Sequence, residues 1–452
     1  KAYGIGGNVE ERWTRAHNMM RSVLLAETAK ERKVDKPAIL EARGHLEIIR
    51  RKVLKHGLSP DLQVQREKKQ KELLRLERPE IKPSDPETAK RMADQSDKCT
   101  RAMFQSYKGV ASQQWINEMK IALEWKDGHE PSYSWAGGEV KRTTHAKQVS
   151  GTIREYYKML YAEKEYDAGA SRAILEEMGK TQITKAARKQ LDKPITDQEL
   201  QDVMEALPTG KQAGPDRIPN EVYKYMSSFF APKLGALIRR SITKGQLPEE
   251  MRKGDICTLF KKGDRDEVRN YRPITLLQNS YKIFMRVLAK RMASVVHQFV
   301  AETQKGFVPH TFIADCTMLM NLVEAYINEG DDESKKGLMV FLDMEKAFDR
   351  VSYDFLMGGL QTLGFGDHFM GTIGMMYNTT RPPQRRIYAN GYYSDWFDIK
   401  SGVAQGCPLS PLLFLIVAQG LKSALDIKGV RGIDIKGLTL VLSQFADDTT
   451  LI

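Results

Sequence analysis

Cysteine is scarce in this sequence of 452 residues, and the few cysteines form no recognisable site. They stand alone, with no C-x-x-C pair and no histidine at zinc-ligand spacing, at Cys99, Cys257, Cys316 and Cys407. A zinc finger is therefore not expected. Isolated thiols of this kind are typical of the reduced cysteines of an intracellular protein.

Long apolar runs and glycine-rich phosphate loops are also missing. No stretch approaches ~20 uninterrupted apolar residues, so neither a membrane span nor a membrane partner is expected. Strands and helices alternate without a G-x-G-x-x-G or P-loop motif, which argues against Rossmann and P-loop chemistry. The chain starts at Lys1 with neither an initiator methionine nor a signal peptide, so we expect a fragment of a longer protein.

Positive charge, in contrast, is in excess. The chain has 70 Lys and Arg against 58 Asp and Glu, a net charge of +12. Such a surface favours polyanionic partners, nucleic acid before a membrane. Residues 251–300 are rich in Lys and Arg, whereas residues 301–350 are rich in Asp and Glu. This succession suits a site that needs cations for phosphates and carboxylates for metal ions.

The local sequence character predicts three regions. Residues 1–78 form a basic, helical N-terminal region, with a charged helix over 63–78. Residues 79–194 begin with a proline-rich linker and continue as a helical extension. Residues 195–452 mix short apolar strands with helices. The sequence does not decide whether the first two regions bind RNA.

Local signals fix several elements of the third region. Thr196, followed three residues later by Glu199, predicts the capping box of a helix that ends near residue 208. Asn390-Gly391 predicts the turn of a hairpin over 384–399.

Two apolar strands and one helix are also predicted. The strands cover 255–260 and 337–344. The helix covers 412–424, with Ser410 at the N-cap and Pro411 at the first helical position.

Two acidic motifs carry the chemistry. A hydrophobic strand delivers Asp343 to its end, and Asp447 and Asp448 lie between β-prone segments, as in a strand–turn–strand. Neighbouring strand residues face opposite ways, so only a turn lets both of these aspartates approach one site. Three gathered carboxylates repel one another unless cations bind, and two Mg²⁺ ions ~3.5–4 Å apart satisfy that need and serve phosphoryl transfer.

The order of the motifs strongly resembles the reverse transcriptases of LINE-type, non-LTR retrotransposons, over residues 195–452. The motifs are L-F-K-K-G-D at 259–264, N-Y-R-P-I at 270–274, D-x-x-K-A-F-D at 343–349, G-x-x-Q-G-C-P-L-S-P at 402–411 and F-A-D-D at 445–448. The resemblance implies an α+β fold: the fingers and split βαβ palm of a right-hand polymerase, after a mainly helical N-terminal region. The family's thumb and endonuclease find no match in this chain.

The resemblance assigns the metal ligands. Asp343 and Asp447 would hold two catalytic Mg²⁺ ions, with Mn²⁺ as a substitute, and Asp448 would be a weaker partner. These three residues would be the catalytic set.

The resemblance also implies a dNTP site. Lys261 (or its neighbour Lys262) and Arg272 match residues that hold the triphosphate. Phe348 occupies the steric-gate position, where a ring excludes a 2′-OH. Gln405 and Gly406 match the loop that packs on the nascent pair, and they complete the predicted dNTP-binding set.

Template and primer contacts are implied at Gln304, Gly306 and Phe307. After Pro309 the family usually shows Gly-Arg-Ser, whereas this chain has residues 310–312 as His-Thr-Phe, so an expected cation is absent. Residues 211–216 resemble the first fingers motif, and Arg217 replaces a common glycine.

The implied function is RNA-directed DNA polymerisation from a DNA 3′ end, with an RNA template, a DNA primer or target and dNTPs as partners. The implied residence is nuclear, with a cytoplasmic ribonucleoprotein stage.

Two other interpretations stay open. A group II intron-type reverse transcriptase and maturase uses the same palm but has Tyr-Ala-Asp-Asp where this chain has F-A-D-D at 445–448. The other interpretation is a non-catalytic RNA-binding remnant of a decayed element. The intact acidic motifs argue against it, and the missing thumb argues for it. Salt-dependent RNA binding without metal-dependent synthesis would favour the remnant.

Overall fold

The computed structural model describes residues 8–31, parts of 41–53, and residues 59–77, 116–122, 140–163, 167–328, 337–435 and 437–452. The proline-rich linker predicted at the start of residues 79–194 lies outside the described residues, as does Cys99.

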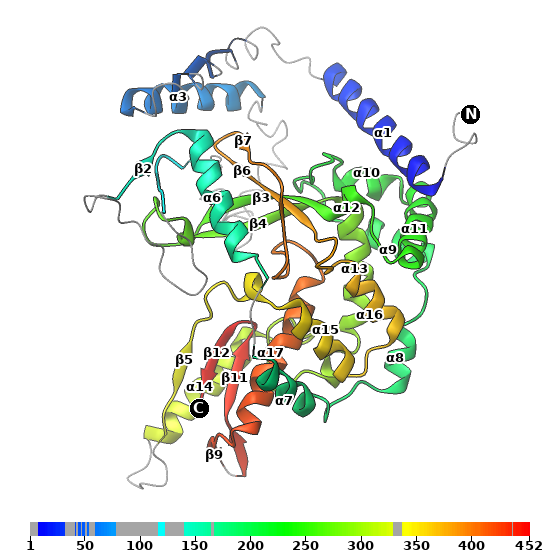
Figure 1. The fold of residues 1–452 in the computed structure, drawn as a ribbon, viewed down its shortest axis with the longest axis vertical. Coiled ribbons are helices and arrows are strands. Elements are labelled where there is room, and N and C mark those ends of the chain that lie inside the picture. Colours follow the sequence, from blue (N-terminus) through cyan, green and yellow to red (C-terminus); the bar gives the residue numbers. More distant parts are fainter. Residues whose placement is uncertain are drawn as a thin grey trace, which may run out of the picture.

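Two long helices represent the N-terminal region (Figure 1). They are α1 (Val9–Glu31) and α3 (Pro60–Glu77), which agrees with the helix predicted over 63–78. α1 packs on α11 (Ser227–Lys244). Trp13 and Ala16 of α1 are buried, so this helix contributes to the main core.

A five-stranded sheet forms one layer of the molecule. Its order is β4-β3-β6-β7, with β8 also paired to β6, and its strands are β3 (Lys253–Phe260), β4 (Tyr271–Leu277), β6 (Gln384–Ala389), β7 (Tyr392–Tyr393) and β8 (Phe397–Asp398). β3 pairs antiparallel with β4 and parallel with β6. The predicted hairpin is confirmed: Asn390 and Gly391 have φ of 51° and 82°, as a tight turn between β6 and β7 requires.

Helix α6 (Ala146–Leu160) lies across this sheet and contacts β6 and β7 (Figure 1). One face of α6 is buried, which its amphipathic sequence explains. A short pair, β1 (Met119–Lys120) with β2 (Arg142–Thr143), precedes it.

A three-stranded antiparallel sheet carries the acidic motifs. Its order is β11-β12-β5, with strands β5 (Val340–Leu342), β11 (Leu442–Phe445) and β12 (Asp448–Leu451). The strand predicted over 337–344 is thus shorter in the structure. Phe445 pairs with Asp448, so Ala446 and Asp447 form the predicted turn. In Figure 1 this sheet lies at the opposite end of the molecule from α3.

Helices surround the two sheets. They are α7 (Ala168–Met178), α8 (Lys185–Leu191), α9 (Asp197–Glu205), α10 (Asn220–Tyr225), α12 (Glu249–Arg252), α13 (Asn279–Ala293), α14 (Ile313–Asn328), α15 (Tyr353–Thr362), α16 (Asp367–Gly374) and α17 (Ser410–Ile427). The two short strands β9 (Ile433–Ile435) and β10 (Leu438–Leu440) pair with each other. α17 packs against α7 and α15.

α17 is a core helix. By length and composition alone it could cross a membrane, but over half of it is buried inside the protein.

The start of α17 differs from the prediction. It begins at Ser410, Leu409 holds the N-cap, and no side chain caps it. The prediction of Ser410 as N-cap was therefore wrong by one residue. In the structure Ser410 is buried and Leu409 has helical dihedral angles.

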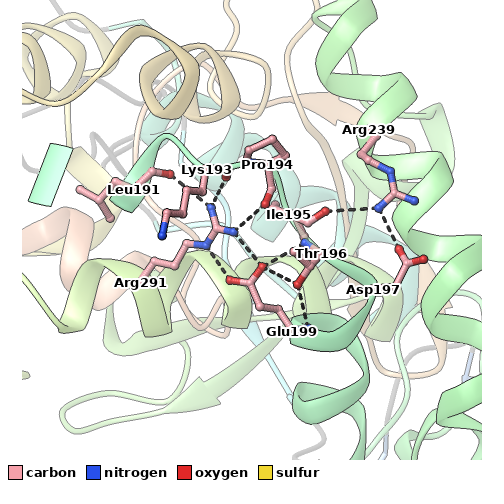
Figure 2. Close-up of polar contacts among 9 residues, drawn as sticks. All are labelled: Leu191, Lys193, Pro194, Ile195, Thr196, Asp197, Glu199, Arg239 and Arg291. Carbon is pink, nitrogen blue, oxygen red and sulfur yellow. Dashed lines mark hydrogen bonds and ion pairs between the residues drawn. The ribbon is translucent and has the colours of Figure 1, made fainter. Parts of the chain in front are cut away.

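The start of α9 confirms the capping box and shows how it is anchored (Figure 2). The Thr196 hydroxyl accepts from the Glu199 amide, and the Glu199 carboxylate accepts from the Thr196 amide at 3.0 Å. Arg291 of α13 donates to both Glu199 oxygens, at 2.8 and 2.7 Å, and to the carbonyls of Leu191, Lys193 and Pro194. Burial alone would raise the pKa of Glu199, but these hydrogen bonds lower it below its ordinary value.

Candidate active site

A cavity of about 770 Å³ lies between the two sheets. Its walls come from the β3–β4 connection, the segment after β5, the loop before α17 and the β11–β12 turn. It contains every predicted dNTP-binding residue and two of the three predicted metal ligands: Lys261, Arg272, Phe348, Gln405, Gly406, Asp343 and Asp447. Lys262 lines it as well, so the choice between the two lysines stays open.

The two carboxylates reach the cavity from different segments. Asp343 directly follows β5, and Asp447 lies in the β11–β12 turn. Burial raises the pKa of Asp447, the charges of Asp448 and Asp343 raise it further, and the charge of Lys261 lowers it. The pKa of Asp447 therefore depends on the two neighbouring carboxylates and on a cation that lines the cavity.

Asp448 is placed differently. It begins β12, is exposed, and does not line the cavity. Within the described part of the chain, no three His, Cys, Asp or Glu side chains form a group able to hold a metal ion. The three predicted aspartates thus do not form such a group; two of them, Asp343 and Asp447, line the cavity, together with Glu267 and Glu345. The predicted role of Asp448 as a weaker metal ligand stays a prediction.

This donor set fits Mg²⁺. Carboxylate oxygens are hard ligands, and Mg²⁺ is usually held by one or two carboxylates together with substrate phosphates and water. Asp343 and Asp447 supply two carboxylates, and Lys261 and Arg272 supply cations for the phosphates of the same ligand.

Gln304 holds the turn that carries Asp447. Its side chain is 3% exposed; its amide oxygen accepts from the Ala446 amide at 2.8 Å, and its amide nitrogen donates to the Ala446 carbonyl at 3.0 Å. Ala446 has φ of 61°, a left-handed conformation that such bonds help to hold. A Cβ on Gly306 would lie 2.2 Å from the Ala446 nitrogen, so only glycine fits there.

This placement changes the interpretation of the predicted template contacts. Gln304 and Gly306 are buried against the turn, where they support the acidic residues, and their contact with a template or primer stays a prediction. Phe307 is 49% exposed, and its ring meets the Phe348 ring edge-on, with centroids 6.3 Å apart. Phe307 is the member of this set that a template or primer could reach.

Phe348 is held by aromatic packing. Its ring stacks on Phe414 of α17, with centroids 4.5 Å apart and an interplanar angle of 18°. It is half-buried and also lines the cavity. A ring fixed in this way can limit the room beside a bound sugar.

Backbone hydrogen bonds join the loop before α17 to β4 and to the segment that follows β5. Its Gln405 carbonyl accepts from the Thr275 amide of β4 at 2.8 Å, and its Val403 amide donates to the Phe348 carbonyl at 2.8 Å. Gly406 has φ of 124°, and a Cβ there would lie 2.5 Å from the Thr275 oxygen. Glycine therefore lets the loop approach β4 closely.

Two charged residues, the buried Asp349 and the partly buried Lys346, were not assigned a role from the sequence. The Asp349 carboxylate accepts from the Tyr161 hydroxyl at 2.6 Å and from the Gln405 amide nitrogen at 2.9 Å, and burial raises its pKa to about 6. Burial lowers the pKa of Lys346 to about 8, and its ammonium donates to the Tyr271 carbonyl. Both lie in the D-x-x-K-A-F-D motif, which was the available signal. Tyr161 carried no signal.

Comparison with known proteins agrees with this geometry. Residues 260–452 match the family described as "Reverse transcriptase (RNA-dependent DNA polymerase)". The chain is 28% identical to a Xenopus laevis protein named "Transposon TX1 uncharacterized 149 kDa protein", over 67% of this chain and 23% of that protein.

Two insect proteins are also similar. A Pol polyprotein of the type-1 retrotransposable element R2 of Popillia japonica is 30% identical over 49% of this chain and 32% of its own length. The "Probable RNA-directed DNA polymerase from transposon BS" of Drosophila melanogaster is 27% identical over 58% of this chain and 28% of its own length. The chain thus spans about a quarter to a third of these relatives.

Residues 260–452 are thus similar to reverse transcriptases. Within that class, the relatives are proteins of non-LTR retrotransposons, which agrees with the resemblance of the motifs.

Proposed function

We propose that this chain copies RNA into DNA, as the RNA-directed DNA polymerase of a non-LTR retrotransposon, using the cavity between the two sheets. The observation that carries the proposal is the meeting of Asp343 and Asp447 with Lys261 and Arg272 in one cavity. These two aspartates can hold metal ions and these two cations can hold phosphates, which is what a metal–nucleoside triphosphate complex needs.

The two sheets take different parts in this proposal. The five-stranded sheet, which supplies Arg272, corresponds to the fingers of a right-hand polymerase, and the three-stranded sheet, which carries Asp343 and Asp447, corresponds to the palm.

Each group has a role in binding or orientation. Asp343 and Asp447 would hold two Mg²⁺ ions. When bound, the ions supply charge neutralisation at the primer 3′ oxygen and at the phosphates. Lys261 binds the triphosphate as a point charge, and Arg272 binds it as a two-pronged donor. Phe348 restricts the space at the sugar and so disfavours a 2′-OH. Catalysis then rests on positioning and on fixed charge.

The test is extension of a DNA primer on an RNA template with dNTPs by wild type and Asp447→Ala. We expect the substitution to abolish extension because it removes one of the two proposed metal-binding carboxylates, and to leave RNA affinity within about twofold because the cationic surface is unchanged. Retained extension in Asp447→Ala would sink the assignment of this cavity.

A further inference from the structure

Asp349 joins the nucleotide cavity to a helix outside the matched domain. Its side chain is fully buried, and its two carboxylate oxygens take different partners. One accepts from the Tyr161 hydroxyl at 2.6 Å, and the other accepts from the Gln405 side-chain amide at 2.9 Å. Gln405 lines the cavity, whereas Asp349 and Tyr161 lie behind it.

Tyr161 reaches this position from the end of α6. It directly follows the helix and is 3% exposed, and its carbonyl accepts from the Lys400 amide at 2.9 Å. Its ring stacks on Tyr157, one turn earlier, with centroids 6.1 Å apart. The hydroxyl and carbonyl of one residue thus contact both Asp349 and the start of the loop that carries Gln405.

The loop also packs on the Asp349 backbone. Gly402 has φ of 84°, and a Cβ there would lie 2.6 Å from the Asp349 carbonyl oxygen. The neighbouring Val403 amide donates to the Phe348 carbonyl. Backbone contacts therefore set the distance between Asp349 and Gln405, and the side-chain bond is left to set the orientation of the amide.

An ionised carboxylate only accepts hydrogen bonds, so it orients a glutamine amide in one sense. The amide nitrogen must face Asp349, and the amide oxygen with the second N–H is left for a ligand in the cavity. Without Asp349, the amide nitrogen and oxygen could exchange places. A nucleotide would then meet a mixture of donor and acceptor patterns.

We propose that Tyr161 and Asp349 fix the Gln405 amide in one orientation and thereby set the affinity of the cavity for deoxynucleoside triphosphates. Tyr161 and Asp349 are positioning residues, because they act on the nucleotide through Gln405. The inference rests on the proposed polymerase function and extends it to α6, which precedes the matched residues 260–452.

The experiment is single-nucleotide incorporation on an RNA template, with the KM for the dNTP and kcat measured separately. We expect Tyr161→Phe to raise the KM about three- to tenfold, the effect of about one buried hydrogen bond, with kcat within about twofold. Asp349→Asn keeps the size of the side chain, and we expect it to raise the KM in the same way. It keeps the test decisive where Tyr161→Phe folds poorly.

The matched control is Tyr223→Phe. Tyr223 of α10 is fully buried, its hydroxyl bonds to the His17 ring nitrogen at 2.6 Å, and neither residue lines the cavity. This substitution removes a comparable buried hydroxyl, and we expect the KM to stay at the wild-type value. An equal rise of the KM in Tyr223→Phe would overturn the proposal, because it would reflect general loosening.

A double-mutant cycle provides the readout that a merely structural bond would not change. In a Gln405→Ala background, Tyr161→Phe should raise the KM no further, because the group on which it acts is gone. An unchanged KM in Tyr161→Phe alone, or a full additional rise in the Gln405→Ala background, would overturn the relay while leaving the polymerase function standing. A wild-type chain that neither incorporates nor binds dNTP, the latter measured by equilibrium binding of labelled dNTP, would overturn both.

Discussion

Replacing Asp349 by asparagine should stabilise the protein at neutral pH, although the carboxylate is well hydrogen-bonded. Burial raises the pKa of this carboxyl group from an ordinary value of 3.8 to about 6, against the lowering effects of the Tyr161 and Gln405 bonds and the Lys346 and Arg350 charges. Since the folded-state pKa lies above the unfolded-state value, folding is favoured while the group is protonated. That contribution is full below pH 3.8 and is lost as pH rises through about 6.

The magnitude follows from the shift. About two pKa units at ~1.4 kcal/mol each give about 3 kcal/mol of unfolding free energy. Asparagine resembles the protonated acid and does not titrate. The gain of Asp349→Asn over wild type should therefore be near zero at pH 4 and reach about 3 kcal/mol above pH 7.

The assay is urea unfolding of both proteins at a series of pH values, with the difference in unfolding free energy plotted against pH. Asp395→Asn, at an exposed carboxyl group, is the control. A difference for Asp349→Asn that stays flat between pH 4 and 7, or that falls with rising pH, would refute the reasoning. If Asp349→Asn is more stable at neutral pH and also has a higher KM for the dNTP, the wild-type carboxylate lowers the stability of the protein and strengthens nucleotide binding.

Two further substitutions test the supports of the site. Gln304→Ala removes both bonds to Ala446 and should lower kcat about 10- to 100-fold through misplacement of Asp447, with the KM for dNTP little changed. The control is Gln298→Ala, which removes the hydrogen bond that the Gln298 side chain accepts from the Thr184 amide. Equal losses of kcat in the two variants would contradict the assignment. Arg291→Leu should cost about 2–3 kcal/mol in urea unfolding, since the buried guanidinium serves one carboxylate and three carbonyls. Arg239→Leu, at the half-exposed pair with Asp197 (Figure 2), should cost under about 1 kcal/mol, and a cost as large as that of Arg291→Leu would show that burial does not decide the effect.

Local signals predicted the local parts of the fold and of the site. The Asn390-Gly391 turn, the capping box at Thr196 and the strand–turn–strand around Asp447 each depend on a few consecutive residues, and all three are present. The cavity gathers the motif residues because each motif lies at the start or end of a strand, or just before a helix, at the same place between the sheets.

The supports of the site could not be predicted in this way. Gln304 bonds to Ala446 across 142 residues, and Tyr161 bonds to Asp349 across 188. In a sequence, a buried structural glutamine cannot be told from an exposed glutamine that contacts a ligand. A tyrosine at the end of a helix is most often a core residue with no further role. Their roles follow from tertiary contacts that no periodicity or spacing encodes.

The most direct test of the central claim is primer extension on an RNA template with dNTPs, with and without Mg²⁺ or Mn²⁺, by wild type, Asp343→Asn and the control Asp315→Asn. Asp315 is an exposed carboxylate on α14. The assay is run on residues 1–452 and, in parallel, on a chimera that carries after Ile452 the segment that follows F-A-D-D in a curated relative. We expect metal-dependent extension that Asp343→Asn abolishes and Asp315→Asn leaves intact. Extension that survives Asp343→Asn, or RNA binding without extension by either form of the wild-type chain, would contradict the account.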